Sequence, residues 1–303
     1  MMIRLGEPRS LGVPAPEARL HFDTELQEVG GGPRRRLLMV DDEPAFELSF
    51  YCGTCPLLFR RLETATRKLS LESVQDRLAG ALEDPDDGGV IEAFGALLPE
   101  GEYLPLLLDV EPRLVVPGQQ GDYFSGEQVA TWGIDQFWGL PEYPHTPYYR
   151  TFETAVDADA HLYEFVVPMV PPTWNERERV EEYVALMGRG TVPTAVAIST
   201  LDVCQPSLGL ADDPSTHWGL THFLLDGHHK LEAAANGRSA GADPLAPGPG
   251  RRPGRSGGQR PVACRPHPTP LGPSHQYLKQ RRRPHQRDNN SAHPGQLHRQ
   301  QAN

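Results

Sequence analysis

The feature that most constrains this chain is a strand-to-helix turn within residues 218–236, WGLTHFLLDGHHKLEAAAN. Gly219–Leu225 is an apolar run of strand length, and Leu231–Ala235 is a run of strong helix formers that ends at an Asn-Gly pair. The segment DGHHK, residues 226–230, is therefore predicted to lie where a strand ends and a helix begins. The first backbone N–H groups of a helix have no partner inside it, and a glycine beside them permits close approach of a ligand.

The side chains of this turn suit an anion. Two imidazoles and an ammonium beside a helix N-terminus form a cradle for phosphate, so we predict that Gly227, His228, His229 and Lys230 bind it. The alternative is that Asp226 caps the helix and that the histidines are ordinary surface residues.

The residues before the turn form a regular series of elements. Leu162–Val167 is predicted as a strand, and Thr173–Glu176 as a capping box. The apolar spacing that follows predicts an amphipathic helix that ends at Gly188 or Gly190. Val192–Ile198 is predicted as a buried strand, followed by a loop that carries Cys204.

This series resembles the ParB and sulfiredoxin-like superfamily. The likeness rests on a proline-containing entry, the helix NERERVEEYVALMGRG, the strand PTAVAIS and a second strand that runs into DGHHK, and it covers about residues 161–236. DGHHK is close to the DGHHR turn of a bacterial branch of that superfamily, which includes uncharacterised proteins and ParB-related free serine kinases. The resemblance implies an α+β protein with a ParB/sulfiredoxin-like C-terminal domain whose turn binds nucleotide phosphates.

The resemblance also implies roles for individual residues. The serine kinases use an acidic base near the start of the domain, for which Glu176 or Glu178 could serve. Two departures from the pattern are visible. Lys230 replaces the usual arginine and so removes a bidentate phosphate fork, and no cysteine occupies the turn, which argues against sulfiredoxin chemistry.

The leading functional hypothesis is binding of a nucleotide, with transfer of phosphate to a small molecule. ATP and Mg²⁺ are the expected cofactors, and the expected catalytic residues are Asp226, which positions the turn or a Mg²⁺ ion, together with His228 and Glu176. The alternative is a non-catalytic regulatory or interaction module of the same fold. A third hypothesis, a metal-dependent hydrolase, would use His217, His222 and the two turn histidines. Positions 217 and 222 would, however, face opposite sides of one strand.

A CxxC motif lies at residues 52–55, where Cys52 and Cys55 come just before Pro56. A cysteine beside a helix N-terminus has a stabilised thiolate, so the pair is a redox candidate. Zinc would need two further ligands, and no second CxxC or nearby CxxH pair is present. The remaining interpretation is that both cysteines pack under the start of a helix.

An aromatic-rich segment spans residues 121–152. Aromatic side chains in an irregular segment can line a ligand groove or stack on bases. The segment has few lysines and arginines, so we favour the interpretation that it seals a loop-rich region against the core.

These observations divide the chain into four parts. We predict a flexible segment at 1–33, a mixed α/β region at 34–155 that holds the CxxC motif and the aromatic segment, a truncated ParB/sulfiredoxin-like domain at 156–236, and a disordered basic tail at 237–303. Within the second part, Arg36–Val40 and Phe46–Tyr51 are predicted as a hairpin. Helices are expected behind Pro56 and Ser70 and at Ile91–Leu98, and strands at Tyr103–Val110 and Arg113–Val116.

Charge is unevenly distributed. Residues 237–303 hold 12 of the 29 basic residues but only Asp243 and Asp288 of the 40 acidic ones. Residues 1–236 are therefore strongly acidic, which argues against a nucleic-acid-binding surface on the folded part of the protein. The tail is rich in proline and begins abruptly, which indicates either a shift of the coding frame near Asn236 or a genuine basic tail that binds nucleic acid or the acidic body.

No signal peptide or membrane-length apolar run is visible, so we expect a cytoplasmic protein without a membrane partner.

Overall fold

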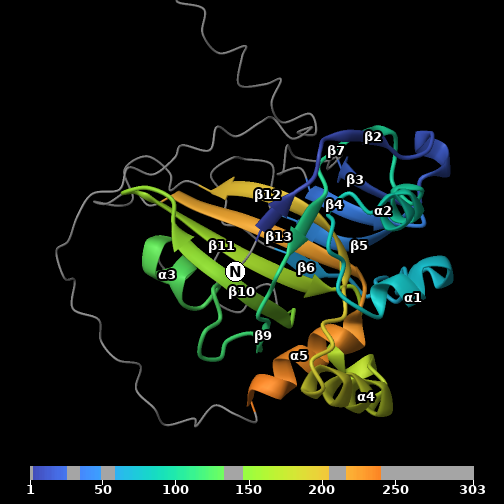
Figure 1. Cartoon of the computed structure of the whole chain (residues 1–303). Coiled ribbons are helices and arrows are strands. Elements are labelled where there is room, and N and C mark those ends of the chain that lie inside the picture. The colour runs from blue at the N-terminus through green and yellow to red at the C-terminus, as the bar shows by residue number, and fades with distance from the viewer. Residues whose placement is uncertain (1–2, 26–34, 49–58, 133–145, 205–215, 240–303) are drawn as a thin grey trace, which may run out of the picture. The chain divides into compact units, whose positions relative to one another are not determined.

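A five-stranded mixed sheet carries the turn (Figure 1). In this computed structural model, which describes residues 3–25, 35–48, 59–132, 146–204 and 216–239, the strand order is β12-β13-β11-β10-β9. β11 and β13 are parallel, and the other neighbours are antiparallel. The strands are β9 (Arg113–Val115), β10 (Tyr148–Ala155), β11 (Ala160–Pro168), β12 (Val196–Cys204) and β13 (Thr216–Asp226).

Two helices accompany this sheet. α4 (Arg177–Gly188) connects β11 with β12, and α5 (His228–Ser239) follows β13 directly; Figure 1 shows the two side by side. Leu231 and Ala235 of α5 pack on one face of the sheet against Tyr149, Val166 and Leu224. The other face carries the larger core.

A four-stranded antiparallel sheet in the order β3-β4-β5-β6 contributes to that larger core. Its strands are β3 (Leu20–Glu25), β4 (Arg35–Val40), β5 (Glu43–Leu48) and β6 (Phe59–Arg61). β4 and β5 form the predicted hairpin, and its turn places Asp41 and Asp42 at φ of 50° and 63°. The ring centroids of Phe46 and Phe223 lie 5.1 Å apart, which joins the two sheets.

The N-terminal residues form ordered elements, so the predicted flexible segment 1–33 is wrong for its described part. β1 (Ile3–Leu5) pairs with β8 (Leu106–Leu108), and β2 (Arg9–Leu11) pairs with β7 (Gly101–Tyr103). The short η1 (Ala15–Glu17) follows. Partners about a hundred residues away stabilise these strands, and such pairing leaves little local pattern in the sequence.

The helices of the N-terminal half are short. They are η2 (Glu72–Val74), α1 (Gln75–Leu78), α2 (Gly88–Gly95) and α3 (Glu127–Trp132). The side chain of Asp87 caps α2 by accepting from the Val90 N–H. The helix predicted behind Pro56 is wrong in its described part, because β6 and a coil segment take its place. Pairing of β6 with β5 outweighs the local helical spacing there.

The aromatic segment packs into the core wherever it is described. Tyr123, Phe124 and Tyr148 are fully buried and surround Phe59 and Phe165, with ring centroids 5.1–5.9 Å apart between neighbouring rings. The sealing interpretation is therefore confirmed for these residues. Residues 133–145 of the segment, and Cys52 and Cys55, lie outside the described residues.

Three further predictions need correction. α4 begins at Arg177 with Glu176 as its N-cap and no capping side chain, because residues 172–174 form η3 (Pro172–Trp174) in place of a capping box. Cys204 is buried at the end of β12 and does not lie in a loop. The boundary at residues 155 and 156 falls inside the β10–β11 hairpin, since a sheet pattern in sequence does not reveal which strands pair.

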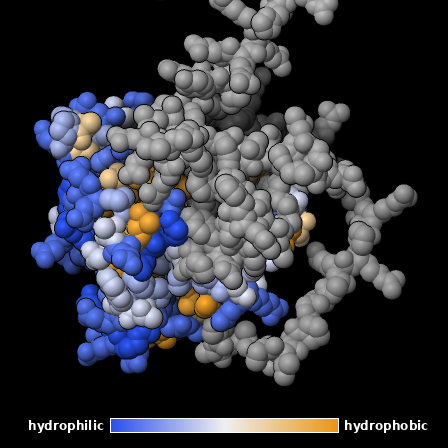
Figure 2. All heavy atoms as spheres, turned by 180° about the vertical axis from the view of Figure 1, so that it is seen from behind, coloured by the Kyte–Doolittle hydropathy of each residue, from blue (hydrophilic) through white to orange (hydrophobic). Residues whose placement is uncertain are grey.

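The chain belongs to the α+β class, as predicted. α5 continues to Ser239, three residues past the predicted helix end. Among the described helices, none has the length and hydropathy needed to cross a membrane. Seen from behind, the described surface is mostly hydrophilic, with hydrophobic residues in small separate groups (Figure 2).

Candidate functional site

The predicted strand-turn-helix arrangement is confirmed. β13 ends at Asp226, Gly227 takes a φ of +95°, and α5 begins at His228. A Cβ atom on Gly227 would lie 2.6 Å from the Cβ of Ala195. Glycine is therefore required here both for its backbone conformation and for the close approach of β12's leading segment.

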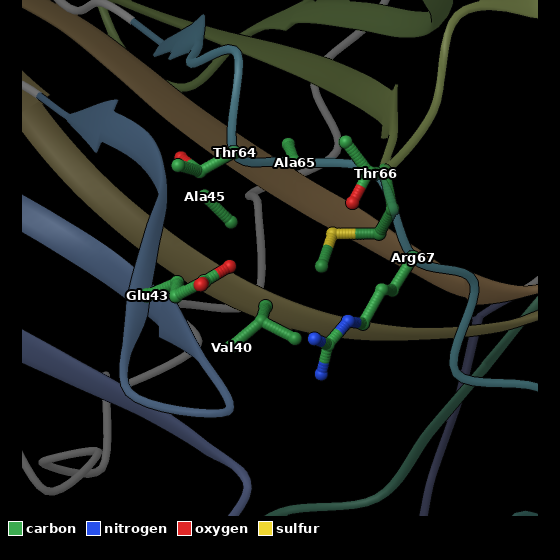
Figure 3. A pocket seen from close by; sticks show the side chains of 8 residues that line it. Val40, Glu43, Ala45, Thr64, Ala65, Thr66 and Arg67 are labelled. Atoms are coloured by element: carbon green, nitrogen blue, oxygen red, sulfur yellow. The ribbon is translucent and has the colours of Figure 1, made fainter.

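A cavity of about 280 Å³ surrounds the turn. Its walls come from the segment that leads into α1, from the first residue of α1, from α4 and from the turn: Lys68, Ser70, Glu72, Gln75, Arg179, Tyr183, Asp226, Gly227, His228, His229 and Lys230. A second hollow, between the β4–β5 hairpin and residues 64–67, has a volume of about 10 Å³ (Figure 3). That volume is about enough for one water molecule, so only the cavity at the turn can hold a small-molecule ligand among these two.

Lys230 forms part of the inner wall and is 4% exposed. Its Nζ donates to the carbonyl oxygens of Leu78 at 3.1 Å and Thr194 at 2.9 Å, and to Oδ2 of Asp226 at 3.3 Å. An ammonium has three N–H donors, so these contacts use all of them. Lys230 thus ties the turn to α1 and to the segment just before β12. Its ammonium group is occupied by these contacts and is not free to bind a phosphate.

Asp226 is the acidic partner in this inner wall. Burial would raise the pKa of its carboxyl, but hydrogen bonds from Ser70, Lys230 and Gln75 hold that pKa below its usual value. Gln75 Nε2 donates to Oδ1 at 3.2 Å while Lys230 engages Oδ2. Both carboxylate oxygens therefore have protein partners, and the side chain fastens the turn to the η2–α1 segment.

The outer wall carries the other cationic groups. Lys68 Nζ donates to Oδ1 of Asn175 at 3.3 Å, and burial lowers the pKa of its ammonium although Glu176 and Asp226 oppose this. Arg179 lies exposed on α4, and no ion pair joins it to any residue that the structure describes. Lys68 and Arg179 both lower the pKa of His229, after the larger effect of burial, and all three residues line the cavity.

His229 is half-buried at the first turn of α5. Its Nε2 accepts a hydrogen bond from the backbone N–H of Glu176 at 3.2 Å. A neutral imidazole that accepts at Nε2 carries its proton on Nδ1, and the lowered pKa of His229 favours the neutral ring. His229 is therefore a hydrogen-bond donor within the wall of the cavity.

His228 is 3% exposed, and neither ring nitrogen has a hydrogen-bond partner among the described residues. Burial, with a smaller repulsion from Lys68, lowers the pKa of its imidazole to about 3. The ring is thus neutral at physiological pH. It provides a wall of the cavity rather than a positive charge.

A polar bridge fixes α4 against α5 beside the cavity. Glu232 accepts from Nδ2 of Asn175 at 2.8 Å and pairs with Arg177 at 2.6 Å. Asn175 Nδ2 also donates to the carbonyl of His228 at 3.4 Å, so the bridge reaches the turn itself. Glu176, the predicted base, lies next to this bridge but is not among the residues that line the cavity.

The sequence interpretation missed Lys68, Gln75 and Arg179 as parts of the site. Lys68 and Gln75 precede the turn by more than 150 residues, and no motif marks them. Arg179 belongs to the predicted amphipathic helix, and nothing in the sequence of that helix indicated that its polar side chains would lie beside the turn.

The histidines of the metal hypothesis are separated. His217 contacts Tyr123 at 2.8 Å and Thr131 at 3.0 Å, whereas His222 contacts Ser199 and Glu164 on the other face of the sheet. No group of three or more His, Cys, Asp or Glu side chains suited to a metal ion occurs in the described part of the chain.

Comparisons with protein-family models, with curated proteins and with solved structures gave no match.

Proposed function

We propose that the cavity at the β13–α5 turn binds the phosphate of a small phosphorylated ligand, with a nucleotide as the leading candidate. The observation that carries this proposal is the meeting of Lys68, Arg179 and the N-terminus of α5 at one cavity.

The backbone of the turn supplies hydrogen-bond donors. The first hydrogen bond within α5 runs from Leu231 N–H to the Gly227 carbonyl at 2.9 Å. The amides of His228, His229 and Lys230 precede that bond and belong to the helix start, where N–H groups have no partner within the helix. The helix dipole adds a partial positive charge at the same place.

Size favours a ligand that is only partly enclosed. The cavity volume of about 280 Å³ lies just below the usual range for small-molecule pockets, about 300–1,000 Å³. A phosphate with part of an attached group fits this space, while a base would extend beyond it. The ParB/sulfiredoxin-like resemblance, which we retain as a proposal, points to the same ligand class.

The residues of the turn fit a phosphate better than a Mg²⁺ ion. Both oxygens of Asp226 are engaged, and a divalent cation there would lie beside the Lys230 ammonium. We therefore assign no metal to Asp226. In phosphate transfer, Lys68, Arg179 and the α5 amides would hold the phosphate, and Glu176 remains the candidate base.

A non-catalytic regulatory module is the second candidate. It is favoured by the engaged state of Asp226 and by the position of Glu176 outside the cavity lining, because neither of these predicted catalytic carboxylates is placed to act as a base on a ligand in the cavity. Release of ADP from ATP, with and without a small hydroxyl compound as acceptor, separates catalysis from binding alone.

Calorimetric titration of the whole protein with ATP, AMP and adenosine tests phosphate recognition. We expect both nucleotides to bind, and adenosine to bind at least about tenfold more weakly because it loses a charge-assisted hydrogen bond worth about 1.5–3 kcal/mol. Equal affinity for adenosine and ATP would contradict the proposal.

A further inference from the structure

A polar row crosses four adjacent strands on the face of the five-stranded sheet that α5 partly covers. Ser199 of β12 contacts His222 of β13, with 2.6 Å between Oγ and Nδ1. Nε2 of the same imidazole lies 3.2 Å from Oε1 of Glu164 on β11. Thr151 of β10 donates to the second oxygen of Glu164. No member of this row lines the cavity at the turn, so the row is a separate cluster.

The donors and acceptors of this row are arranged in one direction. Burial would raise the pKa of Glu164, but hydrogen bonds from His222 and Thr151 keep it below its usual value, so the carboxylate is an acceptor. Nε2 of His222 must then carry the proton that Glu164 accepts. Nδ1 is left as the acceptor for the hydroxyl proton of Ser199. This is the order of a nucleophile, a base and an acid that orients the base.

The row opens at its serine end. Glu164 is 1% exposed and His222 is 4% exposed, whereas Ser199 is half-buried on β12, the edge strand of the sheet. A buried carboxylate and imidazole behind a more accessible hydroxyl form the gradient of exposure that a serine nucleophile needs, since the substrate must reach only the hydroxyl.

An apolar surface lies next to Ser199 on the same face. Side chains two residues apart in a strand share a face, so Leu201 and Val203 follow Ser199 along β12, and Leu220 follows His222 toward the start of β13. Leu201 is 43% and Val203 46% exposed, and Leu220 is half-buried. On the opposite side of the row, the sheet is covered by Leu231 and Ala235 of α5.

We propose that Ser199 is the nucleophile of a second site, which hydrolyses esters with a short apolar acyl group. Ser199 Oγ bonds to the ester carbonyl carbon while its proton passes to Nδ1 of His222. The bond to the leaving alcohol then breaks, and that alcohol takes the proton from Nδ1. A water molecule cleaves the acyl-serine by the same path, which restores the Ser199 hydroxyl and releases the acid. The apolar surface beside Ser199 accepts the acyl group, and Glu164 orients the imidazole.

A fluorophosphonate probe, which phosphonylates activated serines, tests this site in the whole protein. We expect labelling at Ser199, located by mass spectrometry of its peptide, together with hydrolysis of p-nitrophenyl butyrate. Ser199→Ala should abolish both reactions. Glu164→Gln should slow both by about 10²-fold or more, the usual contribution of acid–base catalysis. Thr200→Ala is the matched control, because that neighbouring hydroxyl points to the opposite face of the sheet.

A cysteine variant provides a second measurement that does not depend on ester turnover. If His222 activates position 199, Ser199→Cys should react with iodoacetamide at least about tenfold faster than Thr200→Cys at neutral pH, because thiolate formation controls the rate. Absence of probe labelling at Ser199 in the wild-type protein, or equal alkylation of the two cysteine variants, would overturn the proposal.

Discussion

The inner and outer walls of the cavity at the turn use the same kinds of side chain for different purposes. On the inner wall, Lys230 meets three oxygen acceptors and Asp226 has a partner for each oxygen. On the outer wall, Lys68 has one amide contact at 3.3 Å and Arg179 is exposed. The difference shows that satisfied charges build the turn, while less satisfied charges are available to a ligand.

The largest expected effect is on the inner wall. Lys230→Ala leaves Asp226 buried without its cation, so the free energy of unfolding should fall by about 3–5 kcal/mol, measured by urea denaturation. Lys68→Ala should lower it by less than about 1 kcal/mol, because Lys68 has one weak contact. Equal losses in the two variants would remove the distinction between the walls.

The pH dependence of stability should report the buried histidines. Burial lowers the pKa of His228 to about 3 and that of His217 to about 4. Below about pH 6.5 the unfolded chain therefore binds protons that the folded chain does not, so the free energy of unfolding falls as the pH drops. His228 alone contributes about 1.4 kcal/mol per pH unit in this range.

The measurement is urea denaturation between pH 7.5 and 4.5, compared with His228→Leu. The variant should show the shallower dependence on pH, whatever its absolute stability. An unchanged slope would mean that the imidazole of His228 titrates near its ordinary pKa and is not enclosed.

The glycine of the turn should give a somewhat smaller effect. Gly227→Ala places a Cβ atom 2.6 Å from Ala195 at a φ of +95°, so we expect a loss of about 1–3 kcal/mol in thermal or chemical denaturation. Gly237→Ala is the matched control, because a Cβ there meets nothing within 4 Å in α5 and should stabilise the helix by about 0.5–1 kcal/mol. Similar outcomes at both positions would show that the turn is not constrained as described.

The smallest expected effect belongs to the exposed cation of the outer wall. Arg179→Ala should weaken ATP binding by about 0.2–1 kcal/mol at low salt, the range for exposed charge pairs, and salt should reduce the difference. Arg189→Ala removes the same charge from another exposed position beyond the end of α4 and should leave affinity unchanged. Identical effects of the two substitutions would indicate a general effect of net charge.

The sequence predicted the parts of the fold that local chemistry determines. Gly227 between an apolar run and a helix-forming run indicated the turn, and the two strand-like segments at Arg36–Val40 and Phe46–Tyr51 indicated the β4–β5 hairpin. Distant pairing gave no such signal. β1 and β2 find partners about a hundred residues away, and the helical spacing behind Pro56 yields to the pairing of β6 with β5.

For the candidate site too, the sequence indicated what neighbouring residues determine and not what distant contacts determine. Asp226, His228, His229 and Lys230 were identified because they are adjacent in sequence, and all four line the cavity. Their individual roles could not be inferred, because whether Lys230 faces a ligand or the Leu78 and Thr194 carbonyls depends on elements far along the chain.

Titration of ATP into Lys68→Ala and into Arg67→Ala tests the central claim most directly. The two variants lose the same charge at neighbouring positions, but Lys68 lines the cavity at the turn whereas Arg67 pairs with Asp41 away from it. If the cavity binds phosphate, Lys68→Ala should weaken ATP binding by about 1–3 kcal/mol, and Arg67→Ala should leave it unchanged. Unchanged affinity in Lys68→Ala, or an equal loss in both variants, would contradict a phosphate site at this turn.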